Sequence, residues 1–325
     1  MGTQDPTRRS RRHALATLGA LAAATLLPAL GRAATTGTLR IGYQKSSTLI
    51  TVIKTRGTLD ALLAPLGVAP SWHEFASGLP LLEALNLGNV DFSADVADTV
   101  PVFAQAAGAD LTFVARETPS PSAQAILVKA DSPIRALADL KGKRIGFAKA
   151  AGAHYLLLAA LQSVDLSFAD ITPAYLAPAD GRAAFERGAL DAWVVWDPFL
   201  AAAQRQAGAR ILADGRNLAS YQRYYLAATP YARAHPQVLQ ALVDELRRTG
   251  QWVRQRPKDA AGLLAPVWGL DADTIEMANA RRSYDVQPVR AGSLDEQQRI
   301  ADAFFREKLL PRAIDANAVA LFPAG

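Results

Sequence analysis

The chain has 325 residues, of which half are hydrophobic and 20% are charged. This composition supports a large core and excludes a disordered or fibrous protein. The formal net charge is +5, but residues 1–33 hold five arginines against one aspartate, so the rest of the chain carries only +1. Nucleic acid is therefore not expected as a partner. Cysteine is absent, which excludes thiolate nucleophiles, thiolate zinc sites, disulfides and a lipid-anchored cysteine.

The N-terminus has the pattern of an export signal. An arginine pair, Arg11–Arg12, precedes an apolar run, Ala14–Leu30, and a small-x-small ending, Gly31–Ala33. These features predict a signal peptide over residues 1–33 that is cleaved near Ala33, and a periplasmic mature protein. The run is short for a membrane span, so a single-helix anchor is the alternative. The serine before the pair and the leucine after it favour the twin-arginine type. The general secretory route is the alternative, because alanine stands where that pattern carries phenylalanine.

From residue 38 to residue 206, short apolar runs alternate with segments of helical pattern. Strands are expected at Leu39–Tyr43, Ser71–Phe75, Val90–Ala94, Leu111–Ala115, Ala125–Val128, Arg144–Ala148, Ala174–Leu176 and Ala192–Trp196. Helices are expected at Leu79–Leu87, Val100–Ala107, Ile134–Leu140, Ala153–Ser163, Arg182–Arg187 and Phe199–Gln206, and only helices from Pro236 onward. This alternation predicts an α/β protein with mainly parallel sheets.

The loops that follow the predicted strands are the candidate ligand site. Four of them, at residues 44–48, 76–80, 149–155 and 196–198, lead into helices. Free backbone N–H groups and helix dipoles at such places suit an oxyanion, whereas an ordinary strand-to-helix connection is the alternative for each loop. His154 is expected to be neutral because of the helix dipole and to donate one N–H, or else merely to pack.

Catalytic patterns are missing from the sequence. The histidines after the signal, His73, His154 and His235, are isolated, and neither a G-x-S-x-G elbow nor a P-loop occurs. No metal, cofactor or catalytic residue is therefore expected, and the protein is not expected to be an enzyme. Asp95 and Asp98 lie three residues apart. Asp98 is interpreted as the N-cap of a helix that begins near Thr99, and a functional carboxylate pair is the alternative.

From Leu39 to about Pro288 the sequence resembles the periplasmic aliphatic sulfonate-binding proteins of ABC importers. The resemblance rests on the order and spacing of motifs at residues 39–45, 78–85, 102–108, 125–128, 138–143, 154–157, 182–188, 191–198 and 281–284. Two segments beside the implied site, residues 96–101 and Ala150–Ala151, depart from the family pattern and leave the preferred anion open.

The resemblance implies a type II periplasmic-binding-protein fold, in which two α/β lobes are joined by two crossovers with the ligand cleft between them. Lobe 1 would comprise residues 34–124 and 226–325, and lobe 2 residues 125–225. Carried over by position, the ligand-binding residues would be Gln44, Ser46, Ser47, Gly78, Leu79, Asp98, Ala153, His154, Tyr155, Trp196 and Asp197.

The implied function is that of a monomeric solute-binding component that takes up aliphatic sulfonates for sulfur supply. Its partners would be a small organosulfonate, an inner-membrane permease and the ATPase of that permease. Taurine, a sulfate ester or a thiamine-precursor pyrimidine on the same fold is the alternative. An enzyme on this fold is a further alternative, but the desulfinases among such relatives rely on a cysteine.

Overall fold

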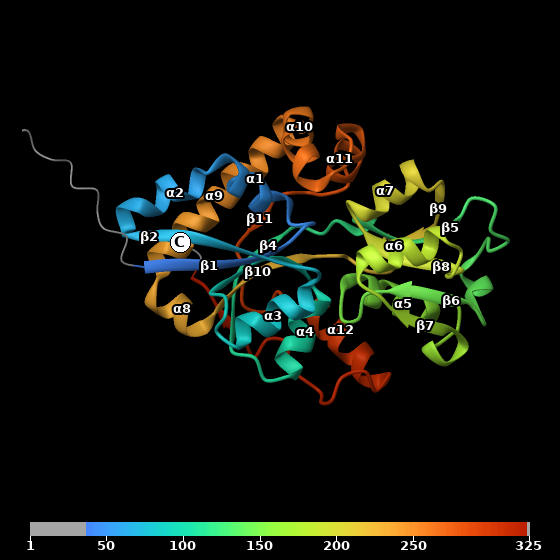
Figure 1. Cartoon of the computed structure of the whole chain (residues 1–325). Coiled ribbons are helices and arrows are strands. Elements are labelled where there is room, and N and C mark those ends of the chain that lie inside the picture. Colours follow the sequence, from blue (N-terminus) through green and yellow to red (C-terminus); the bar gives the residue numbers. More distant parts are fainter. Residues whose placement is uncertain (1–36, 324–325) are drawn as a thin grey trace, which may run out of the picture. The chain divides into compact units, whose positions relative to one another are not determined.

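Two β-sheets organise residues 37–323, the part of the chain that the computed structural model describes (Figure 1). The predicted signal peptide lies outside the described residues. The first sheet has the order β11-β4-β10-β3-β1-β2, with β12 also on β4, and the second has the order β7-β6-β8-β5-β9. The strands of the first sheet are β1 (Gly37–Gln44), β2 (Val68–Phe75), β3 (Phe92–Ala97), β4 (Leu111–Glu117), β10 (Arg223–Ala228), β11 (Val286–Gln287) and β12 (Ala320–Leu321). Those of the second are β5 (Gln124–Lys129), β6 (Arg144–Phe147), β7 (Thr172–Tyr175), β8 (Ala192–Trp196) and β9 (Ala209–Asp214).

Helices pack against both sheets, which confirms the α/β class. The helices that accompany the first sheet are α1 (Thr48–Arg56), α2 (Thr58–Leu63), α3 (Gly78–Asn86), α4 (Thr99–Ala106), α8 (Thr229–Ala234), α9 (Pro236–Gln255), α10 (Pro257–Trp268), α11 (Ala272–Asn279) and α12 (Asp295–Arg306). Those of the second are α5 (Gly152–Gln162), α6 (Pro178–Glu186) and α7 (Phe199–Gln206). Within the described residues, no helix combines the length and the apolar character that a membrane span requires.

Most strands of each sheet run in the same direction, as predicted, but each sheet also contains an antiparallel strand, β10 in the first and β5 in the second. Strand β1 runs parallel to β2 and β3, and β6 runs parallel to β7 and β8. In contrast, β10 is antiparallel to β3 and β4, and β5 is antiparallel to β8 and β9. The reason is the path of the chain. Each of these two strands begins at the edge where its neighbours end, because the chain has just come across from the other sheet.

Two short connections therefore join the carboxyl edges of the two sheets. The chain leaves the first sheet at Glu117 and enters the second at Gln124, then leaves β9 at Asp214 and returns at Arg223. Connections this short keep the two edges close to each other. The division into lobes at residues 125 and 226 itself remains a prediction.

Two large hydrophobic clusters hold the elements in place. One joins β1 to α1, α9 and α10, and the other extends from α3 and α4 into the second sheet and α5. The strands β3 and β8 are buried along their whole length, as expected for strands covered by helices on both faces. The strand ends and the loops after them are thereby positioned by the packed core.

Several elements differ from the sequence prediction. A helix was expected after the loop at residues 44–48, where α1 lies, but no range was predicted for it. The helix α2 and the strands β9 and β10 were not predicted, and the short strands β11 and β12 interrupt the region after Pro236 that was expected to be purely helical. The helix expected at Ile134–Leu140 is reduced to a 3₁₀ turn over Leu137–Leu140.

Candidate functional site

The candidate site lies where the carboxyl edges of the two sheets approach each other; we call these the facing edges. In the second sheet, Gln124 at the start of β5 pairs with Trp196 at the end of β8. In the first sheet, Arg223 at the start of β10 pairs with Ala97 and Glu117, near the ends of β3 and β4. Polar residues from distant parts of the chain are thus brought to the same region.

A buried charge cluster, Asp95, Glu117, Arg223 and Arg282, lies at the edge of the first sheet. The Asp95 carboxylate is 2.6 Å from Arg223 Nε and 3.1 Å from Arg282 Nη2, and Arg282 Nη2 donates to Glu117 at 2.6 Å. Glu117 also accepts from the Tyr225 hydroxyl at 2.7 Å. Burial opposes the charge of Arg282, but the two carboxylates outweigh it and raise its pKa above the ordinary value. Two carboxylates and two guanidinium groups thus face each other, and their formal charges cancel.

Several buried donors near this cluster have no hydrogen-bond partner among the described residues. They are Ser46 Oγ in the loop after β1, the Gln124 amide at the start of β5, Trp196 Nε1 at the end of β8, and Arg282 Nε. Buried polar groups in proteins are almost always satisfied, so each exception calls for an explanation. Three of these donor residues lie at the strand ends of the facing edges, which is the position of a bound ligand in open α/β sheets.

The start of α5 packs against this group of donors. A Cβ atom on Gly152 would lie 2.6 Å from the Tyr221 ring and 3.0 Å from Gln124 Oε1. Tyr221 in turn accepts a hydrogen bond from Arg223 Nη1 at 2.7 Å. The helix N-terminus, with its free N–H groups, is thus held against both the second sheet and the charge cluster.

Asp98 caps α4, which confirms the capping prediction. Its Oδ1 accepts from the backbone N–H of Thr99 at 3.0 Å, and its Oδ2 accepts from that of Gln222 at 2.9 Å. Burial raises the pKa of Asp98 to about 7, and these hydrogen bonds oppose the rise. The carboxyl group also fixes the second connection between the sheets, to which Gln222 belongs.

Gln44, Ser46 and Ser47 lie at the end of β1, where all three are buried. The amide of Gln44 donates to the backbone oxygen of Asp95 at 3.3 Å, which joins this loop to the charge cluster. Gly78 and Leu79 begin α3 beside Val100. The structure therefore places the loops after β1, β3 and β8 at the facing edges, whereas their role in binding remains a prediction.

His154 is enclosed by aromatic side chains. Its ring lies 4.9 Å from Phe147, 4.8 Å from Phe304 and 6.2 Å from Phe103, measured between centroids. Its Nδ1 accepts from the Ala150 N–H at 3.2 Å, so the other ring nitrogen carries the proton. Burial, followed by the charge of Lys149, lowers the pKa of His154 to about 3. The ring is neutral as expected, and burial is the main cause. Its protonated Nε2 is buried without a hydrogen-bond partner among the described residues, so donation to a ligand remains a prediction, with packing as its alternative.

The two residues that flank His154 share its helix turn. Ala153 is fully buried, and Tyr155 packs against Phe304 at 6.1 Å between centroids. Their predicted part in binding would therefore rest on the backbone of α5.

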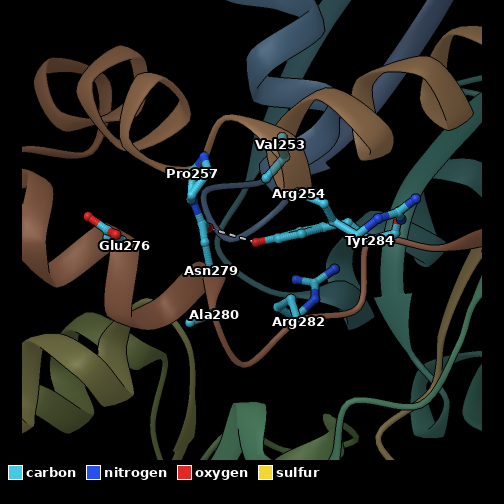
Figure 2. Close-up of a pocket in the computed structure, with 8 residues that line it drawn as sticks. All are labelled: Val253, Arg254, Pro257, Glu276, Asn279, Ala280, Arg282 and Tyr284. Carbon is cyan, nitrogen blue, oxygen red and sulfur yellow. Dashed lines mark hydrogen bonds between the residues drawn. The ribbon is translucent and has the colours of Figure 1, made fainter.

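Two hollows lie beside Arg282 of the charge cluster, next to the segment that follows α11. One is a narrow space lined by Thr48, Asp197, Pro198, Trp268, Ala278, Asn279, Arg282 and Tyr284. The other, of about 320 Å³, shares Asn279, Arg282 and Tyr284 with it and is shown in Figure 2. The Tyr284 hydroxyl points toward Asn279 and donates to its Oδ1 at 2.7 Å, with the Arg282 guanidinium beside the tyrosine (Figure 2). The Arg282 side chain therefore belongs both to the charge cluster and to the lining of these two hollows.

Sequence reasoning missed Gln124, Tyr221, Arg223 and Arg282. Gln124 and Arg223 begin strands rather than follow them, so a search of the loops after strands passes over both. Arg282 lies in a motif at residues 281–284 that marked the family resemblance, and this motif was the available signal.

Comparison with known proteins identifies a matching family model and similar solved structures. The model of the "NMT1/THI5 like" family matches residues 76–260. The structure of the alkanesulfonate-binding protein SsuA from Xanthomonas axonopodis pv. citri bound to MOPS is 40% identical with a TM-score of 0.83, covering 87% of this chain and 98% of that one. The crystal structure of the periplasmic aliphatic sulphonate binding protein SsuA from Escherichia coli is 41% identical in sequence with a TM-score of 0.78. The match covers 86% of this chain and 90% of that one.

A curated relative from Escherichia coli (strain K12), also named for aliphatic sulfonate binding, is 41% identical over 278 residues, 85% of this chain and 86% of its own length. The desulfurization enzyme DSZB is 18% identical with a TM-score of 0.63, covering 87% of this chain and 96% of that one, and this shows a shared fold alone. By its family model and by these identities, the chain belongs to the NMT1/THI5-like family and to the aliphatic sulfonate-binding proteins.

Proposed function

We propose that this protein is the solute-binding component of an ABC importer and that it binds aliphatic sulfonates at the facing edges. The relatives with 40–41% identity are named for alkanesulfonate or aliphatic sulfonate binding, and one of them holds MOPS, itself a sulfonate. The observation that carries the proposal is the group of buried, unpartnered donors, Ser46 Oγ, Gln124 Nε2, Trp196 Nε1 and Arg282 Nε.

A sulfonate matches these donors in chemistry. It offers three acceptor oxygens and one negative charge, and it stays ionised at any physiological pH. The charge cluster has no net charge, so the anion would be held by N–H and O–H donors and by the N-terminus of α5, with one further N–H from Arg282. The remaining predicted residues, such as Gln44 and Ser47, would shape the loops that enclose it.

The transport role follows from the same family membership. The protein would be exported through its predicted signal peptide, act in the periplasm as a monomer, and deliver its sulfonate to an inner-membrane permease driven by an ATPase. The sulfonate would serve as a source of sulfur. A sulfinate-cleaving activity is not proposed, because such a relative would need a cysteine and the chain has none.

The test is calorimetric titration in phosphate buffer with methanesulfonate, butanesulfonate and MOPS, with chloride and acetate as controls. Sulfonates should bind and should stabilise the fold by about 2.7 kcal/mol at 100 times the dissociation constant, whereas the control anions should not. Gln124→Leu should weaken binding at least tenfold, whereas Gln240→Leu on α9 should not. Binding of taurine, a sulfate ester or a pyrimidine in preference to every alkanesulfonate would overturn the assignment.

A further inference from the structure

The helices α7 and α11 meet although they belong to different sheets. Helix α7 packs on β8 and β9 of the second sheet, whereas α11 packs on α10, which in turn contacts α1 beside the first sheet. Figure 1 shows α7 and α11 facing each other across the region where the sheets approach. This contact therefore joins an element of the second sheet to an element packed beside the first, outside the two chain connections.

A buried ion pair holds the contact together. Arg281, just after α11, donates from Nη1 to both carboxylate oxygens of Asp197, at 3.0 and 3.1 Å. Its Nη2 donates to the side chain of Gln204 in α7. The Asp197 side chain is 4% exposed and that of Arg281 is 17% exposed. Asp197 Oδ1 also accepts from the Ala201 N–H at 3.0 Å, so the carboxylate is fixed at the start of α7.

The contact between α7 and α11 also has solvent-exposed ion pairs at its rim. Arg205 of α7 lies 3.5 Å from Asp271 and 3.4 Å from Asp273, and all three side chains are well exposed. Exposed pairs contribute little, whereas loss of one partner of a buried pair is strongly unfavourable. Arg281, Asp197 and Gln204, which we call the latch, should therefore dominate the contact between the two helices.

We propose that the latch holds the facing edges together before ligand arrives, and that Arg281 is thereby a positioning residue for ligand binding. Asp197 directly follows Trp196, whose unpartnered Nε1 belongs to the proposed site, so opening the latch moves a ligand donor away from the donors of the first sheet. A protein that is closed only part of the time binds more weakly, in proportion to the closed fraction. This inference rests on the proposed function for its effect on affinity, but not for its effect on the ligand-free protein.

The first experiment measures the ligand-free protein alone. The chain has no cysteine, so Ala61→Cys on α2 and Ala189→Cys after α6, both exposed, can each carry a spin label. Pulsed dipolar spectroscopy should give one main distance for the otherwise unchanged chain. Arg281→Ala should add a second, shifted population, Arg281→Lys should restore most of the first, and Arg205→Ala should change neither. An unchanged distribution in Arg281→Ala would overturn the latch.

The second experiment titrates the same variants with MOPS in phosphate buffer. Arg281→Ala should weaken binding at least tenfold, Arg281→Lys less, and Arg205→Ala less than twofold. If Arg281→Ala does not fold by circular dichroism, Asp197→Asn replaces it, because its amide oxygen still accepts from Ala201 while the charge is lost. Equal affinity in the latch variants and the unchanged chain would refute the coupling. Failure of the unchanged chain to bind any sulfonate would refute the proposed function instead, while the distance measurement still decides the latch.

Discussion

Replacing Arg282 by methionine should destabilise the fold strongly, because it removes a cation that pairs with two buried carboxylates. Methionine keeps much of the side-chain volume but removes the guanidinium that contacts Asp95 at 3.1 Å and Glu117 at 2.6 Å. Breaking a buried ion pair typically costs about 3–5 kcal/mol. Here each carboxylate keeps one partner, Arg223 for Asp95 and the Tyr225 hydroxyl for Glu117. The lower value, about 3 kcal/mol, is therefore expected.

Calorimetry and urea unfolding measure this loss. At roughly 2–4 °C per kcal/mol for large domains, the melting temperature should fall by roughly 6–12 °C. The control is Arg216→Met, because that arginine is 73% exposed in its pair with Asp214 and should cost at most about 1 kcal/mol.

A second substitution separates charge from packing. Adding Glu117→Gln to Arg282→Met removes a buried negative charge that has lost its cationic partner, and should recover about 1 kcal/mol or more. A loss below 1 kcal/mol for Arg282→Met, or a double variant no more stable than the single one, would contradict an electrostatic origin.

Three further predictions concern single residues around the facing edges. Gly152→Ala should weaken sulfonate binding at least tenfold in calorimetric titration, because the new methyl group would lie 2.6 Å from the Tyr221 ring; the control Gly262→Ala, with nothing within 4 Å, should not, and equal affinities would contradict the close packing. Asp98→Asn should flatten the pH dependence of unfolding. Burial raises the pKa of Asp98 to about 7 from an ordinary 3.8, so the stability it contributes is present below about pH 4 and is lost as the pH rises toward 7, by up to about 1.4 kcal/mol per pH unit; parallel urea-unfolding curves for both proteins from pH 4 to 7 would disprove this. His154→Phe should preserve the ring packing and cost about 1 kcal/mol of stability for the lost hydrogen bond from the Ala150 N–H, while the dissociation constant for MOPS stays the same. A tenfold weaker complex would instead make the histidine a ligand donor.

Local sequence signals sufficed for the strands β1 to β8 and for the helices α3 to α7. Strands covered on both faces are continuous apolar runs, such as Ala192–Trp196, and each is bounded by a loop and a helical pattern. Asp98 could be read as a cap because an aspartate directly before a helix satisfies its free N–H groups wherever that helix packs. Features of this kind depend on neighbours within a few residues, which the sequence displays directly.

Other elements form against their local signals. The segment Thr48–Ile53 is rich in β-branched residues, yet it forms α1, because its apolar side chains are buried against α9 and α10. Strand β10 begins with Arg223, which reads as a surface residue, and it is fully buried beside the carboxylate of Asp95 and the Tyr221 hydroxyl. In both cases a tertiary contact outweighs the intrinsic preference.

The candidate site was also only partly predictable from local sequence. The loops after the strands, including Gln44 and Trp196, could be found because the carboxyl ends of strands bind ligands in any open α/β sheet. The charge cluster could not, because Arg223 and Arg282 reach Asp95 from 128 and 187 residues away in the sequence. A charged side chain is stable in the interior only beside its partner, and which residues become partners is decided by the two crossings between the sheets rather than by any local pattern.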